Sequence, residues 1–82
     1  MDLARTQGQL GAALRRRRKN LGLSQDQLAE RIHARQGTIS RLEGGEADAK
    51  LSTLLDILAA LDLELIVQPR STSKAADIAD LF

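Results

Sequence analysis

Apolar residues recur every three or four positions through the first sixty residues, which is the period of a helix with one buried face. Polar or glycine-containing breaks divide this pattern into separate segments. The last segment carries the strongest signal, and its apolar face is expected to hold Leu51, Leu54, Leu55, Leu58 and Leu61, with Ile57 widening it. The expected helices cover about residues 8–20, 24–32, 36–43 and 51–61.

Local signals mark where these helices begin and end. Gly22 follows the first helix and is expected to take the left-handed conformation that closes a helix. Ser24 and Gln27 have the spacing of a capping box, in which each side chain bonds the backbone N–H of the other residue. His33 and Ala34 then form a tight turn between the second and third helices.

After Asp62 the apolar period shortens to two residues, and Pro69 ends the pattern, which predicts a β-strand over residues 62–69. The sequence offers no second strand to satisfy its backbone groups. The economical arrangement is antiparallel pairing with the same strand of a second copy across a two-fold axis. A frayed, extended tail is the alternative. The residues expected to form the dimer contact are Leu63, Leu65, Ile66 and Val67.

Two short helices joined by a turn of three or four residues form a helix-turn-helix, whose second helix enters the major groove of DNA. Residues 25–42 have the required features. Ala29 is small where the two helices must approach closely. The residues placed to fix the angle between the helices are Ile32, Ile39 and Leu42. The segment therefore predicts a DNA-binding motif.

The outward positions around the third predicted helix hold no large apolar side chain. Glutamine can bind adenine and arginine can bind guanine through paired hydrogen bonds, each giving about 1–3 kcal/mol of discrimination. Gly37 would let the backbone approach the groove floor, although glycine costs about 1 kcal/mol of helix propensity. An ordinary solvated helix face is the alternative. The candidate DNA-contacting residues here are Arg35, Gln36, Gly37, Thr38, Ser40 and Arg41.

The segments LGLSQDQLA (residues 21–29) and QGTISRLE (residues 36–43) resemble the XRE family of phage-repressor-like helix-turn-helix domains. The similarity extends over about residues 8–61. It implies an all-α domain of four to five helices with a lambda-repressor-like fold. Histidine at position 33 departs from the glycine usual in the family's turn. Because histidine tolerates the left-handed region better than most residues, we expect the turn to be kept.

The same resemblance assigns roles to residues outside the third helix. It implies that Gln25 contacts a DNA phosphate and braces Gln36. It also implies a structural ion pair between Arg18 and Glu43, joining the first helix to the end of the third. Arg17 lies on the apolar face of the first helix, and its stem is expected at the core edge with its head in solvent.

Residues 54–67, a helix leading directly into a strand, resemble HipB-type antitoxins, the DNA-binding partners of HipA-type kinase toxins. This resemblance implies a dimer that represses its own operon and holds a toxin kinase. The predicted organisation is a DNA-binding domain over residues 1–61, a dimerisation strand over 62–69 and a flexible tail over 70–82. Ile78, Leu81 and Phe82 in this tail could dock in a groove of the toxin; an inert terminus is the alternative.

Charge is divided unevenly along the chain. Residues 1–41 hold nine Lys or Arg and three Asp or Glu, whereas residues 42–82 hold three and eight, although the net charge is only +1. One basic half and one acidic half suggest a face for phosphate and another for a different partner.

The composition argues against several other classes. There is no cysteine and a single histidine, and neither a phosphate-binding loop nor a credible carboxylate pair appears, so we expect no enzyme, metal site or cofactor. Phe82 is the only aromatic residue, which disfavours binding of RNA or single-stranded DNA by stacking. No apolar run approaches the ~20 residues of a membrane span, and the start lacks a signal peptide, so a cytoplasmic location is expected.

The predicted function is that of a homodimeric, sequence-specific repressor that binds double-stranded operator DNA and serves as the antitoxin of a HipA-type kinase. One alternative is a stand-alone phage-type or metabolic repressor without a toxin, which the absence of a neighbouring kinase gene would favour. Another is a protein-interaction adaptor that has lost DNA binding, which failure to bind any operator at any salt concentration would favour.

Overall fold

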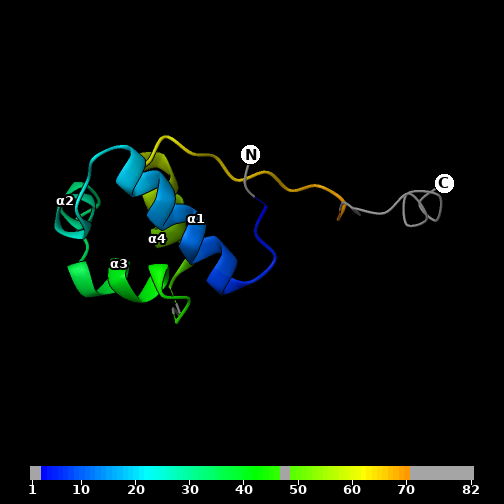
Figure 1. The fold of residues 1–82 in the computed structure, drawn as a ribbon, viewed down its shortest axis with the longest axis horizontal. Coiled ribbons are helices and arrows are strands. Elements are labelled where there is room, and N and C mark those ends of the chain that lie inside the picture. The colour runs from blue at the N-terminus through cyan, green and yellow to red at the C-terminus, as the bar shows by residue number, and fades with distance from the viewer. Residues whose placement is uncertain (1–2, 47–48, 71–82) are drawn as a thin grey trace.

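The computed structural model describes residues 3–46 and 49–70, which contain four α-helices and no β-strand (Figure 1). The helices are α1 (Gln7–Asn20), α2 (Gln25–Arg31), α3 (Gln36–Glu43) and α4 (Leu51–Ala60). The all-α class is confirmed, and each predicted boundary lies within one or two residues of the observed one. The fifth helix that the predicted class allowed is absent from the described residues. No described helix has both the length and the apolarity needed to cross a membrane.

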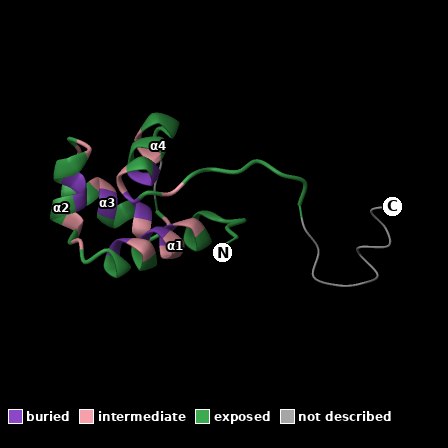
Figure 2. Cartoon of the chain, turned by 90° about the horizontal axis from the view of Figure 1, so that it is seen from above, coloured by how far each residue is buried: buried purple, intermediate pink, exposed green. Residues whose placement is uncertain are grey.

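The core lies where α3 packs against α1 and α2, and where α2 packs against α4. Figure 2 shows the buried positions on the faces that the helices turn toward one another. Ala29 is 3% exposed, as expected for a small residue where α2 and α3 approach closely. The core residues are Leu14, Leu28, Ala29, Ile39, Leu42, Ile57, Leu58 and Leu61.

All four helices end in the same way. The residue after each C-cap has a positive φ, and the next N–H donates to the carbonyl five residues back, which is the Schellman motif. After α2, His33 has φ 56° and the N–H of Ala34 donates to the carbonyl of Ala29 over 2.9 Å. The turn is therefore kept despite the missing glycine, as predicted. The residues with positive φ are Gly22, His33, Gly45 and Asp62.

Beyond α4, residues 63–70 have no regular secondary structure, and after Leu63 the chain runs away from the helices (Figure 1). Leu63 is half-buried and packs against the core, whereas Leu65, Ile66 and Val67 are exposed. The predicted strand is not formed within the single chain, where no described segment pairs with it, so its pairing with a second copy stays a prediction. Ile78, Leu81 and Phe82 lie outside the described residues.

Gly11 marks a close approach between α1 and the end of α3. It is buried, and a Cβ at this position would lie 2.6 Å from the carbonyl oxygen of Glu43 and closer still to that of Leu42. Real Cβ atoms do not approach backbone oxygens so closely. Glycine is therefore required at position 11 for α1 to approach the end of α3 this closely.

We expect Gly11→Ala to lower the free energy of unfolding by about 1–3 kcal/mol, because the crowded methyl group would force the two helices apart. This loss should appear although alanine has the higher helix propensity. Gly8→Ala is the matched control on the same helix, since its Cβ would meet only the Thr6 hydroxyl at 3.9 Å. Urea unfolding measures the unfolding free energy of both variants. A Gly11→Ala variant as stable as Gly8→Ala would contradict the close approach.

Candidate functional site

The outer side of α3 is polar, while its inner side is anchored in the core. Ile39 and Leu42 are 1% and 8% exposed, and they fix the helix on the body of the domain. The candidate DNA-contacting residues of this segment are exposed except for Thr38, which is half-buried. A Cβ added at Gly37 would have no neighbour within 4 Å, so the helix surface is open there. Apart from Thr38, these candidate residues therefore lie at the surface of the domain.

The start of α2 is fixed by the predicted capping box. The hydroxyl of Ser24 accepts from the N–H of Gln27 over 3.0 Å, and the amide oxygen of Gln27 accepts from the N–H of Ser24 over 2.8 Å. This reciprocal pair sets the position of Gln25, the first residue of the helix. Gln36 is likewise the first residue of α3, so the two glutamines stand at neighbouring helix starts.

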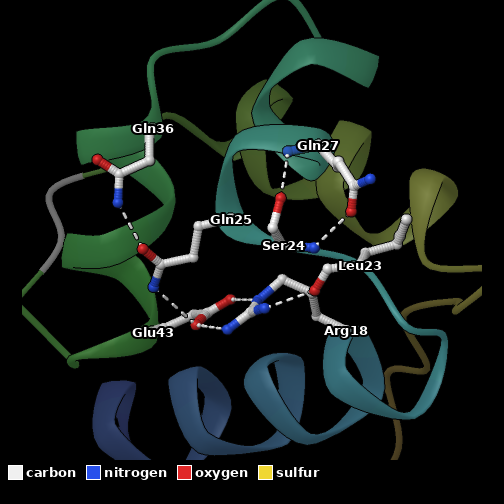
Figure 3. A network of polar contacts seen from close by, with 7 residues as sticks. All are labelled: Arg18, Leu23, Ser24, Gln25, Gln27, Gln36 and Glu43. Carbon is white, nitrogen blue, oxygen red and sulfur yellow. Dashed lines mark hydrogen bonds and ion pairs between the residues drawn. The ribbon is translucent and has the colours of Figure 1, made fainter.

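Gln25 and Gln36 are in direct contact (Figure 3). Residue Gln25 is half-buried, whereas Gln36 is exposed. The Nε2 of Gln36 donates to the Oε1 of Gln25. This is the bracing contact that the XRE resemblance implies. A glutamine side chain that is already hydrogen-bonded to a half-buried neighbour loses less rotamer freedom when it binds a ligand, and this favours ligand binding.

Arg18 and Glu43 form the predicted ion pair beneath these glutamines. The Nε of Arg18 donates to Oε2 of Glu43 over 2.7 Å and its Nη2 to Oε1 over 3.0 Å, and the two side chains are only 8% and 4% exposed. The remaining Nη1 donates to the carbonyl of Leu23 over 2.6 Å. The Nε2 of Gln25 donates to Oε1 of Glu43 over 3.1 Å. One buried pair thus joins α1, the α1–α2 loop, α2 and α3 (Figure 3).

Both members of this pair are stabilised in their charged forms. Burial by itself would raise the pKa of Glu43, but the hydrogen bonds from Arg18 and Gln25 and the positive charges of Arg18 and Arg15 hold that pKa below its ordinary value. The hydrogen bond to Glu43, opposed by burial and aided by the charge of Glu43, raises the pKa of Arg18. The carboxylate is therefore ionised at neutral pH.

The guanidinium group of Arg17 was expected in solvent, but in the structure it contacts the end of α4. Its Nε donates to the carbonyl oxygen of Leu61 over 2.9 Å, just after the end of α4. Its Nη2 is 3.9 Å from the exposed carboxylate of Asp62. A cation at a helix C-terminus satisfies a carbonyl and interacts favourably with the helix dipole. The only signal in the sequence was an arginine on an otherwise apolar face.

Comparison of the sequence with known proteins identifies the family. The sequence model of the family described as "Helix-turn-helix domain" matches residues 9–66. An uncharacterized HTH-type transcriptional regulator of Haemophilus influenzae is 38% identical over 58 residues, which are 71% of this chain and 59% of the relative. Another, from Sinorhizobium fredii, is 36% identical over 62 residues, which are 76% of this chain and 32% of the relative. The chain thus matches about three fifths of the first protein and a third of the second.

Comparison with solved structures gives the same fold. The HipB chain of a structure described as a HipB–O4 20mer complex has a TM-score of 0.78 and 28% identity, covering 87% of this chain and 100% of its own. A chain of a HipA–HipB–O2–O3 complex gives the same values. The restriction-modification controller protein C.AhdI of Aeromonas hydrophila has a TM-score of 0.67 and 31% identity, covering 71% of this chain and 88% of its own.

The lowered pKa of Glu43 predicts a pH-dependent stability. The unfolded chain binds a proton at Glu43 more readily than the folded chain does. The resulting stabilisation is complete above the ordinary glutamate range and is lost as the pH falls through the lowered folded value. The difference in unfolding free energy between the wild type and Glu43→Gln should therefore be largest near pH 7. It should be about 3 kcal/mol there, and should shrink below about pH 4.

Urea or thermal unfolding across this pH range measures the effect. Glu46→Gln is the matched control, because it removes the same charge from an exposed position three residues later. Its stability should follow that of the wild type at every pH. A Glu43→Gln difference that is the same at pH 7 and pH 3 would contradict the assignment.

Proposed function

The chain belongs to the helix-turn-helix domain family, and we therefore propose that it is a transcriptional regulator that binds double-stranded DNA in a sequence-specific manner through α3. The observation that carries this proposal is the division of α3 into two sides. Ile39 and Leu42 hold one side in the core, and the other side offers only polar side chains and glycine. Such a helix fits a major groove, whose base edges present hydrogen-bond donors and acceptors.

Each exposed residue has a chemistry suited to this role. We assign base reading to Gln36 and Arg41, because their side chains can make paired hydrogen bonds with adenine and guanine. Arg35 precedes the helix and is assigned to a phosphate, as is Gln25. The open surface at Gly37 leaves room for the groove floor. The proposed DNA-contacting residues are Gln25, Arg35, Gln36, Gly37, Thr38, Ser40 and Arg41.

The proposed functional unit is a homodimer. Leu65, Ile66 and Val67 are 54%, 60% and 91% exposed, and consecutive apolar side chains so exposed are typical of a surface that a partner covers. On α4, Leu51 and Leu55 are also 65% and 45% exposed, which the helical period did not predict because it placed them in an apolar stripe. We propose that residues 62–69 pair with their copy and bring two α3 helices about 34 Å apart.

We further propose that the protein represses transcription and acts as the antitoxin of a HipA-like kinase. Two observations support this: the similarity to HipB over nearly the whole length of that protein, and the acidic character of residues 42–82, which suits a partner other than DNA. A stand-alone repressor shares every described feature of α3. Copurification with the product of a neighbouring kinase gene distinguishes the two functions.

The roles assigned to α3 predict two kinds of loss on DNA. After a preferred site has been selected from random duplexes, Gln36→Ala and Arg41→Ala should each reduce preference at one base pair by about 10- to 100-fold. Arg35→Ala should instead weaken binding to preferred and random duplexes equally, and should reduce the slope of log affinity against log salt by about one. Binding titrations at several salt concentrations measure both effects.

The control for lost positive charge is Arg31→Ala, at the opposite end of α2 from Gln25. It should leave affinity and preference nearly unchanged. Equal losses on preferred and random duplexes for Gln36→Ala would remove its base-reading role. Absence of any selected duplex for the wild type would overturn DNA recognition itself.

The dimer proposal predicts that Leu65→Pro is monomeric, because proline removes a backbone donor from the middle of the strand. Analytical ultracentrifugation of the full chain should show a dimer for the wild type and a monomer for the variant. Ala4→Pro is the control, since it places proline in an exposed segment outside the predicted strand. A Leu65→Pro protein that still sediments as a dimer would refute pairing through residues 62–69.

A further inference from the structure

A chain of hydrogen bonds leads from the buried carboxylate of Glu43 to the exposed amide of Gln36 (Figure 3). Oε1 of Glu43 accepts from the Nε2 of Gln25, and Oε1 of Gln25 accepts from the Nε2 of Gln36. The carboxylate is 4% exposed, whereas Gln36 is at the surface. These contacts connect the interior of the domain with the first residue of α3.

The direction of this chain is set by its buried end. An ionised carboxylate can only accept hydrogen bonds, so Gln25 must turn its amide nitrogen toward Glu43. Its amide oxygen then faces the other way, toward Gln36. That oxygen also only accepts, so Gln36 must present its own nitrogen to Gln25. One charge therefore decides the orientation of two amide groups that could otherwise be turned either way.

The arrangement leaves Gln36 with a defined set of free groups. One hydrogen of its nitrogen is used by Gln25, and the second hydrogen and the oxygen remain for a ligand. Adenine needs one donor for its N7 and one acceptor for its N6 amino group, side by side in the major groove. A fixed amide presents this pair in one order, whereas a rotating amide presents both orders.

We propose that Glu43 is a specificity-determining residue that acts through Gln25: its carboxylate fixes the orientation in which Gln36 reads a base. This inference rests on the proposed function, since it concerns how α3 discriminates among DNA sequences. Glu43 is a positioning residue and does not itself touch DNA. Its ion pair with Arg18 keeps it ionised, so the arginine maintains the direction of the chain.

The first test needs no DNA. In the free wild-type protein, NMR of the side-chain amides should show one hydrogen-bonded, slowly exchanging proton on Nε2 of Gln36. Gln25→Met should bring that signal to the values of a free glutamine while leaving Arg18 and Glu43 paired. The double variant Arg18→Met, Glu43→Gln keeps a polar group for Gln25 without leaving an unpaired buried charge. It should give an averaged Gln36 signal, because a neutral amide can donate or accept.

The second test uses the duplex that the wild type selects and compares all four base pairs at the position sensitive to Gln36→Ala. In Gln25→Met and in the double variant, preference at that position should fall from about 10- to 100-fold to a few-fold. Preference at the position sensitive to Arg41→Ala should stay unchanged. A purely structural role for Glu43 would instead weaken binding at every position alike.

Glu30→Gln is the matched control, because it changes an exposed residue near the opposite end of the same helix from Gln25 and touches neither the capping box nor the hydrogen-bond chain. It should keep its base preference. An unchanged Gln36 amide signal in the Arg18→Met, Glu43→Gln double variant would overturn the proposal, as would a loss of preference spread evenly over the site. If the wild type selected no duplex, the proposed function and the base-reading role would fail together, and the NMR signals would still report whether Glu43 orients the amide.

Discussion

The buried pair of Arg18 and Glu43 is the constraint on which the other features depend. Arg18 lies near the end of α1 and Glu43 is the last residue of α3, so their double hydrogen bond fixes the crossing of two helices. That crossing is tight enough to require glycine at position 11. Buried ion pairs add little net stability compared with apolar packing, but removing one partner is strongly destabilising. The pair thus specifies one arrangement of α1 and α3 and penalises others.

Much of the fold could be predicted because its signals are local. Helical period, the Ser24–Gln27 spacing and the position of Gly22 each act within a few residues, and the helix bounds, the capping box and the turn matched the structure, although Leu51 and Leu55 of the predicted apolar face are exposed. Contacts between distant residues could not be derived in this way. The hydrogen bond from Arg17 to Leu61 joins residues 44 positions apart, and no local sequence pattern near either residue predicts it. The Arg18–Glu43 pair was predicted only because a family resemblance supplied it.

The candidate site likewise has features that the sequence predicted and features that it did not. Most of its residues follow from the pattern of α3, since outward positions are polar, and the structure places them at the surface except for half-buried Thr38. The direction of the amides does not follow from any pattern, because it depends on a carboxylate from the far end of the helix. Leu63 shows a third situation: alternation assigned it to a strand, and the Schellman ending of α4 packs it on the core. A strand that begins at Leu63 is compatible with this packing, so one residue can satisfy both patterns.

The division of α3 also bears on how recognition can change in evolution. Positions 37, 40 and 41 are exposed and take no part in the core, so under the proposed function substitutions there alter a binding preference one at a time without loss of the fold. Position 36 is different, because its side chain is tied through Gln25 to a buried charge. A descendant that replaces Gln36 leaves the amide oxygen of Gln25 without the donor that it has here, and selection then acts on both positions. Residues 25 and 36 should therefore co-vary among relatives, whereas the rest of the surface diversifies freely.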